Sequence, residues 1–173
     1  LFANLTARSG NISLTGTTTS GYGLTNFTGA SWGVTTISAD SGAVTLNGFS
    51  TGAGWAIRLG SSSLISARSI TVFGSTATGG DSIELNAMTI VAGGGHLTVT
   101  SRVGASTSRG ITQAGAITNN AAGSNISFIS NGVINQTGTI SLVANTTGTA
   151  ASITYDATSD GVSSSITTGA LSV

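Results

Sequence analysis

Short stretches in which apolar residues alternate with Ser or Thr recur along the whole chain. The clearest form is an apolar residue, a hydroxyl residue and a second apolar residue, as in Ile12-Ser13-Leu14. Alternation with a period of two residues is typical of a β-strand with one buried and one solvated face. The copies of this pattern begin at Ile12, Val44, Ile70, Leu97, Ile126 and Ile153. The chain is therefore predicted to be rich in short strands.

The copies are almost evenly spaced. Their first residues are separated by 32, 26, 27, 29 and 27 positions, which is a period of about 28 residues. Shorter alternating runs, such as 55–59, 83–85 and 140–142, lie between the copies, and Gly-rich segments separate them. Each repeat is therefore predicted to contain two or three strands joined by tight corners, where Gly, Asn and Asp supply unusual backbone angles.

A repeat of this length favours a parallel β-helix over the other all-β fold considered, an antiparallel sandwich. In a β-helix each repeat forms one coil and equivalent strands stack on one another, whereas a sandwich gives no reason for this period. Helices are disfavoured because Gly, Ser, Thr and β-branched residues dominate. We expect one all-β unit over residues 1–173, a right-handed parallel β-helix (solenoid) of about six coils with roughly 28 residues per coil.

Two apolar columns would fill the interior of such a stack. The first residues of the copies form the stacking core, which is Ile12, Val44, Ile70, Leu97, Ile126 and Ile153, and the third residues form the next column. Twenty residues follow Ile153, and Ile12 is the twelfth residue, so two copies joined end to end would place these positions 32 residues apart. Because that step lies within the observed range, we expect a segment of a longer solenoid or a unit that stacks head to tail.

Composition narrows the functions to consider. Charged residues make up 6% of the chain, with no Lys and a formal net charge of zero, against roughly 25% in a typical soluble domain. Five scattered Arg residues do not form the basic patch that nucleic acid requires, so no nucleic-acid partner is expected. No run of 18 apolar residues is present, so no membrane insertion is expected.

The Gly-, Ser-, Thr- and Asn-rich coils are similar to those of a known family. The segments SGNISLTGTTTSG, SGAVTLNGFSTGAG and GSNISFISNGVINQTGTISL resemble the shaft repeats of filamentous-haemagglutinin-like bacterial adhesins of the two-partner secretion and autotransporter class. The resemblance covers essentially the whole chain. It implies a right-handed parallel β-helix, secretion to the extracellular space or the bacterial cell surface, and roles in cell adhesion, biofilm formation or contact-dependent competition.

Carboxylates do not suggest catalysis. Polysaccharide-cleaving β-helices rely on clustered acids, because general acid–base chemistry needs paired groups. Here Asp81 and Glu84 share one coil, Asp156 and Asp160 share another three coils away, and Asp40 stands apart. We expect no catalytic residue and no enzymatic activity.

Metal and cofactor sites are not expected either. His96 is the only His, and its position one residue before Leu97 places it on the solvent face. The stretch GGDSIEL is similar to part of a calcium-binding nonapeptide repeat but occurs once, so Asp81 is interpreted as a corner residue. Six Asn-X-Ser/Thr sequons leave glycosylation open; they begin at Asn4, Asn11, Asn26, Asn125, Asn135 and Asn145.

Aromatic residues offer one candidate partner surface. Phe73 has the outward parity of Thr71, and beside Arg58 or Arg68 it could contact a glycan or a protein, although packing under a loop is favoured. Trp32 lies in the same half of the chain and completes this candidate set.

Trp55 is a different case. It shares its parity with Ile57 and Leu59 and is therefore expected in the core.

Two functions follow as hypotheses. The first is a structural β-helical shaft or filament segment whose partners are neighbouring coils or copies of itself stacked head to tail. The alternative is an adhesin module that binds a surface glycan or protein receptor through its coil loops.

Overall fold

A computed structural model describes residues 4–28, 31–32, 35–60, 64–86, 89–92, 95–104, 108–119, 125–142, 152–157, 166–167 and 171–172. Every regular element in these ranges is a β-strand, and the strands pair in parallel except β4 (Phe27–Thr28) with β5 (Ser31–Trp32). Parallel neighbours lie about 27 residues apart in the sequence. The chain is therefore a β-solenoid, which confirms the all-β, parallel and repetitive character expected from the sequence.

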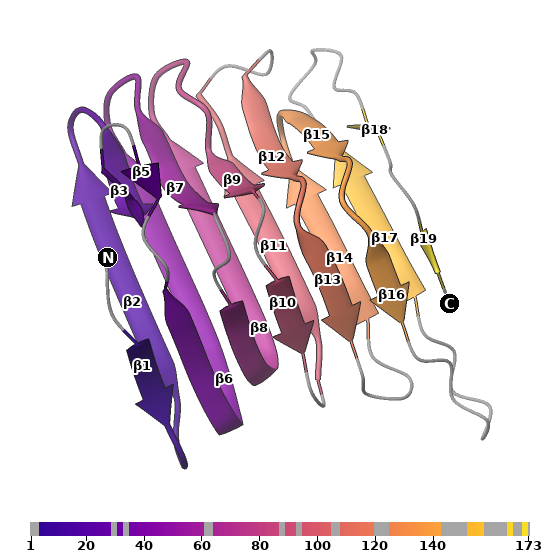
Figure 1. Ribbon diagram of the computed structural model, residues 1–173. Coiled ribbons are helices and arrows are strands. Elements are labelled where there is room, and N and C mark those ends of the chain that lie inside the picture. The colour runs from indigo at the N-terminus through magenta and orange to yellow at the C-terminus, as the bar shows by residue number, and fades with distance from the viewer. Residues whose placement is uncertain are drawn as a thin grey trace.

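The strands form three faces that run along the stack (Figure 1). Face 1 contains β2 (Ile12–Thr18), the second halves of β6 (Thr36–Ser50) and β8 (Leu64–Thr76), β11 (Leu97–Arg102), β14 (Asn125–Ser130) and β17 (Ser152–Ala157). Face 2 contains β3 (Tyr22–Thr25), β7 (Trp55–Gly60), β9 (Ile83–Asn86), β12 (Arg109–Gln113), β15 (Val133–Gln136) and β18 (Ile166–Thr167). Face 3 contains β1 (Asn4–Ala7), the first halves of β6 and β8, β10 (Thr89–Ala92), β13 (Ala116–Asn119), β16 (Ile140–Leu142) and β19 (Leu171–Ser172).

The predicted column on face 1 is present in register. Val44 pairs with Ile70, and Ile70 pairs with Leu97. The same column continues to Ile12 at one end and through Ile126 to Ile153 at the other. The four interior members of the column are 0% exposed, whereas the two end members are partly exposed. Side chains one repeat apart are therefore direct neighbours, which explains why similar apolar residues recur at this period.

All three faces contribute to one continuous core. Face 2 supplies Ile57, Ile83, Ile111 and Ile134, and face 3 supplies Ile37, Ile65, Ile117 and Ile140. Each fully buried aliphatic side chain contributes roughly 1.5–3 kcal/mol to folding. The core, rather than any charge pattern, therefore dominates the stability of the stack.

An inserted hairpin explains the longest step in the repeat. The first step measures 32 residues on face 1, between Ile12 and Val44, and the next measures 26. The β4–β5 hairpin lies between β3 and β6. It adds residues to the first coil at one corner, so the register on the three faces is kept.

The corner between faces 1 and 2 has room only for small residues. A Cβ atom on Gly48 would lie 2.2 Å from the carbonyl oxygen of Ala56, and one on Gly74 would lie 2.6 Å from the Ser82 hydroxyl. In the next coil the glycine is on face 2, and a Cβ on Gly110 would collide with the hydroxyl of Ser130 in the coil that follows. We call Gly48, Gly74 and Gly110 the corner glycines.

No helix of the length and apolarity needed to cross a bilayer is found among the described residues.

Candidate functional site

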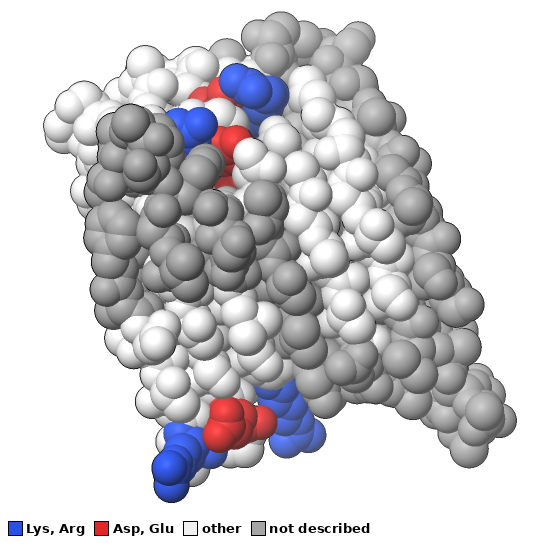
Figure 2. Space-filling view, in the orientation of Figure 1, with Lys and Arg blue, Asp and Glu red and all other residues white. Residues whose placement is uncertain are grey.

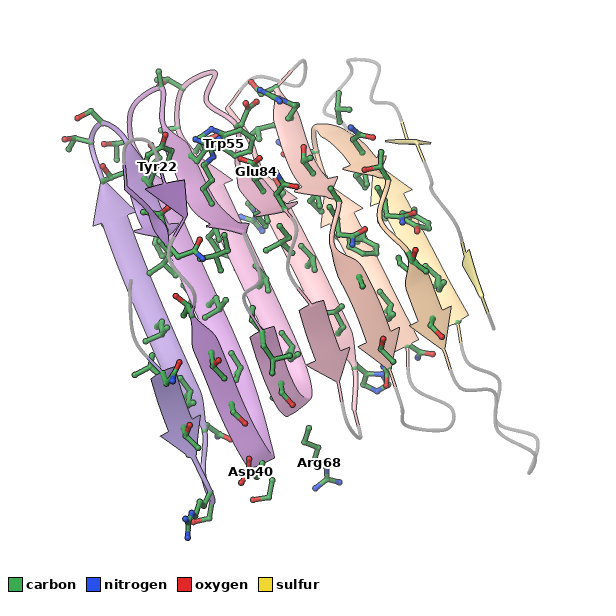
Figure 3. The ribbon with its side chains drawn as sticks, in the orientation of Figure 1. Tyr22, Asp40, Trp55, Arg68 and Glu84 are labelled. Atoms are coloured by element: carbon green, nitrogen blue, oxygen red, sulfur yellow. The ribbon has the colours of Figure 1, made fainter. Side chains whose placement is uncertain are left out.

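Charged and aromatic side chains gather on the outer surface of face 2, between β3 and β12. Figure 2 shows blue and red atoms at two places, one near the top of the visible face and one near its bottom. At one of these places Tyr22, Trp55 and Glu84 come from β3, β7 and β9 and lie together near the upper edge of Figure 3. We call the set Tyr22, Trp55, Arg58, Asp81, Glu84 and Arg109 the face-2 cluster.

Arg58 is the centre of this cluster. Its Nε donates to Glu84 Oε2 at 2.6 Å, and its Nη1 donates to the Tyr22 hydroxyl at 2.8 Å. Its guanidinium carbon lies 5.4 Å from the centre of the Tyr22 ring and 5.7 Å from that of Trp55. Glu84 reaches Arg58 because the two residues are in register on adjacent strands. The guanidinium therefore ties three consecutive coils together.

A second ion pair extends the cluster to a fourth coil. Arg109 Nη2 lies 2.8 Å from Asp81 Oδ2, and the backbone N–H of Arg109 donates to Asp81 Oδ1 at 2.9 Å. The Arg109 guanidinium carbon also lies 5.2 Å from the centre of the Trp55 ring. Because two guanidinium groups contact this indole, cation–π attraction adds to both ion pairs.

The electrostatics of the cluster favour paired charges. Burial alone lowers the pKa of Arg58, but the hydrogen bond and charge of Glu84, followed by those of Tyr22, outweigh it and leave the pKa above its ordinary value. Each carboxylate of the cluster faces an arginine from an adjacent coil rather than another carboxylate. The arrangement therefore holds adjacent coils together through charge pairs.

The expectation that Trp55 is a core residue is wrong. Its side chain is half-buried and lies against Arg58 and Arg109. The strict alternation breaks here because Trp55 opens its strand at a corner, where Ala56 and Ile57 are both fully buried. Parity counted from Ile57 therefore does not hold across the corner.

Three of the four residues of the expected partner surface, Phe73, Arg58 and Arg68, lie at separate places on the stack. Phe73 is on the outer side of face 1 and packs against the ring of Phe49, with 5.8 Å between ring centres. Arg58 is on face 2, and Arg68 lies beside Asp40 at the edge opposite Glu84 (Figure 3). The side chain of Trp32 lies outside the described residues. Phe73 therefore forms an aromatic pair with Phe49.

Two Asn side chains, which we call the corner amides, and His96 form hydrogen bonds with the backbone of a neighbouring coil. Asn26 is fully buried, and its amide both donates to and accepts from the backbone of Gly60, at 2.7 and 3.0 Å. Asn131 makes the same two-way contact with Val103. His96 is exposed as expected, and its Nδ1 accepts the backbone N–H of Asn125 at 3.2 Å. The sequon at Asn26 is therefore closed to glycosylation in the folded chain.

No group of three or more His, Cys, Asp and Glu side chains with the geometry of a metal site occurs in the described part of the chain. Asp160 and Asn145 lie outside it.

Comparisons with protein-family models, curated proteins and solved structures returned no match for this chain.

Proposed function

We propose that the chain is a shaft or filament segment of a secreted or cell-surface bacterial adhesin or extracellular fibre. In this proposal the solenoid is right-handed, has about six coils, and acts by reach and rigidity. Stacked strands are spaced by about 4.8 Å, so six coils extend on the order of 30 Å. Neighbouring coils, and copies of the chain stacked on one another, are its partners.

The observation that best supports this proposal is the continuous apolar column on face 1, which runs from Ile12 to Ile153. Six strand segments pair residue for residue with similar apolar side chains at every level. The face-2 cluster and the corner amides also connect adjacent coils. These contacts resist bending of the stack, which is the mechanical property of a shaft.

Small-angle X-ray scattering and cell labelling together test the proposal. The isolated chain should scatter as a stiff rod of constant cross-section, and an antiserum against it should label the surface of intact source cells. A flexible particle, or label confined to the cytoplasm of opened cells, would contradict the shaft.

A binding module is the second candidate because of the pair Phe49 and Phe73. Phe49 is the one large apolar side chain classed as exposed among the described residues, at 37%. The two rings lie on adjacent coils of face 1, with Thr45, Asn47 and Thr71 at neighbouring outward positions. Aromatic surface with neighbouring hydroxyl and amide groups suits a neutral glycan or a protein loop.

A glycan and protein array separates the two candidates. If the module binds through this surface, the double variant Phe49→Ser/Phe73→Ser should lose binding, whereas Ile129→Ser should keep it. Ile129 is a matched control because it lies in the same outward column as Phe73, two coils away. Absence of binding by the unaltered chain would leave the shaft as the sole candidate.

A further inference from the structure

Six outward side chains form two adjacent columns over three successive coils of face 1. One column is Asn47, Phe73 and Thr100, and the other is Phe49, Ser75 and Arg102. On each strand the residue between the two columns is buried, so the six side chains project from the same outer surface. We call these six residues the face-1 patch.

The two rings of the face-1 patch lie side by side on adjacent coils. Their centres are 5.8 Å apart and their planes are tilted by 54°, so the rings are not stacked face to face. Phe49 is exposed and Phe73 is partly exposed. Exposed aromatic rings pack against the apolar C–H surface of a sugar ring, and neighbouring amide and hydroxyl groups form hydrogen bonds with the sugar hydroxyls.

Arg102 supplies the charge of the face-1 patch. Its side chain is exposed, and it belongs to neither of the two ion pairs found among the described residues. Ser75 separates it from Phe49 within the column, so the two outer positions are about 10 Å apart, or two coil spacings. A guanidinium exposed in this way binds an anionic group through paired, charge-assisted hydrogen bonds.

The surroundings of Arg102 on face 1 are almost uncharged. The parts of β2, β6, β8 and β14 that lie on this face contain no charged residue, and β17 contains only Asp156. Asp156 is in the column of Thr100 but two coils further on, which is about 10 Å along the stack. That separation exceeds the screening length of about 8 Å at physiological salt. The local charge of the face-1 patch is therefore positive.

The size of the face-1 patch favours a sugar over a protein as its ligand. Three coils spaced by about 4.8 Å and two columns spaced by about 7 Å cover an area on the order of 100 Å². Each partner in a standard protein–protein interface contributes about 800 Å². Two rings, three neutral polar side chains and one guanidinium instead match one or two sugar rings that carry an anionic group.

We propose that the face-1 patch is a binding site for an acidic glycan, in which a sugar ring packs on Phe49 and Phe73 and its carboxylate or sulfate pairs with Arg102. This inference rests on the second proposed function, the binding module, and names its ligand class. The two rings alone suit a neutral glycan, and Arg102 adds the preference for an anionic one.

Ligand-observed NMR titrations with three tetrasaccharides test this preference. The probes are a tetramer of galacturonic acid, a tetramer of sulfated galactose and the neutral galactose tetramer. The unaltered chain should bind an acidic tetramer about fivefold more tightly than the neutral one, the upper range for an exposed ion pair. The tighter of the two acidic tetramers identifies the anionic group.

Arg102→Gln should remove the preference for acidic tetramers and leave the affinity for the neutral tetramer unchanged. Arg8→Gln is the matched control, because Arg8 is also exposed but follows β1 on face 3. This control removes the same charge from the chain and should keep the full preference.

The aromatic half of the site is tested separately. Phe49→Ser should weaken binding of acidic and neutral tetramers by the same factor, roughly fivefold, because both lose the ring on which the sugar packs. Phe49→Tyr keeps the ring and should keep binding. Because Phe49 is exposed, neither change removes a core side chain, and circular dichroism verifies that each variant is folded.

Equal affinity of the unaltered chain for acidic and neutral tetramers overturns the inference, as does an equal loss in Arg102→Gln and Arg8→Gln. If the neutral tetramer binds through Phe49 without any preference for acid, the binding module stands and its acidic ligand is wrong. If no tetramer binds at up to about 10 mM, the site is wrong, and a glycan and protein array without binding then removes the binding module as well.

Discussion

Two ion pairs in the face-2 cluster differ in exposure and therefore should differ in energy. The side chains of Arg58 and Glu84 are 24% and 13% exposed, whereas those of Arg109 and Asp81 are 59% and 20% exposed. We compare Glu84→Gln with Asp81→Asn, because both changes remove one charge and keep the shape of the side chain.

The structure gives the expected size of each effect. Glu84→Gln keeps a hydrogen bond from the charged Arg58 guanidinium but removes the charge of the acceptor. Hydrogen bonds to charged groups contribute about 1.5–3 kcal/mol, so the loss of one of the two charges should lower the free energy of unfolding by about 1 kcal/mol. Asp81→Asn keeps an oxygen for the backbone N–H of Arg109 and removes only an exposed pair, so its cost should be below about 0.5 kcal/mol.

Urea unfolding at pH 7, followed by circular dichroism, measures both values. In 1 M NaCl the screening length is about 3 Å, so the effect of Asp81→Asn should vanish while most of the effect of Glu84→Gln remains. An Asp81→Asn cost equal to or larger than that of Glu84→Gln would refute the assignment of Arg58 as the centre of the cluster.

Three further changes test the packing. Gly48→Ala should cost about 1–3 kcal/mol in urea unfolding, because the backbone of Ala56 blocks the added methyl group; a neutral effect would contradict the tight corner. Ser82→Ala should raise the free energy of unfolding by about 1 kcal/mol, since its hydroxyl is buried without a hydrogen-bond partner; a loss would reveal a missed contact. Burial raises the pKa of Tyr155 above its ordinary 10.0, because the buried hydroxyl ionises less readily than an exposed one. The neutral side chain therefore contributes its full stability to the fold below pH 10, and that contribution is lost as the pH rises through the folded-state pKa. Thermal unfolding from pH 8 to 12 should show a smaller alkaline loss for Tyr155→Phe than for the unaltered chain.

The stacked columns were predictable because each strand repeats the same pattern. Val44, Ile70 and Leu97 each precede a hydroxyl residue and a second apolar residue, so the period can be read from residue type alone. Physical stacking enforces this similarity, since each side chain packs on its counterpart one coil away.

The corners were not predictable in the same way. Trp55 was assigned to the core because alternation was extended across a corner, where two consecutive residues turn inward. At a corner the backbone direction changes, so the period of two no longer decides which side a residue faces. Alternation with a period of two therefore predicts the facing of residues only within a strand.

The ion pairs of the face-2 cluster did leave a signal in the sequence. Arg58 and Glu84 are 26 residues apart, and Asp81 and Arg109 are 28 apart, which are steps of about one repeat. A search for opposite charges separated by one period would have found both pairs, although not the two-ring contact of Arg58.

The corner glycines have a consequence for how such a chain can lengthen. Gly48 and Gly74 face atoms that lie eight or nine residues further along the same repeat, whereas Gly110 faces Ser130, which is 20 residues further along and belongs to the next repeat. A duplicated repeat inserted between Gly110 and Ser130 would set a different residue against that glycine. A repeat inserted between Ile83 and Ser101 would keep the existing contacts of all three corner glycines. The packing at this corner therefore restricts the breakpoints at which gene duplication can lengthen the stack.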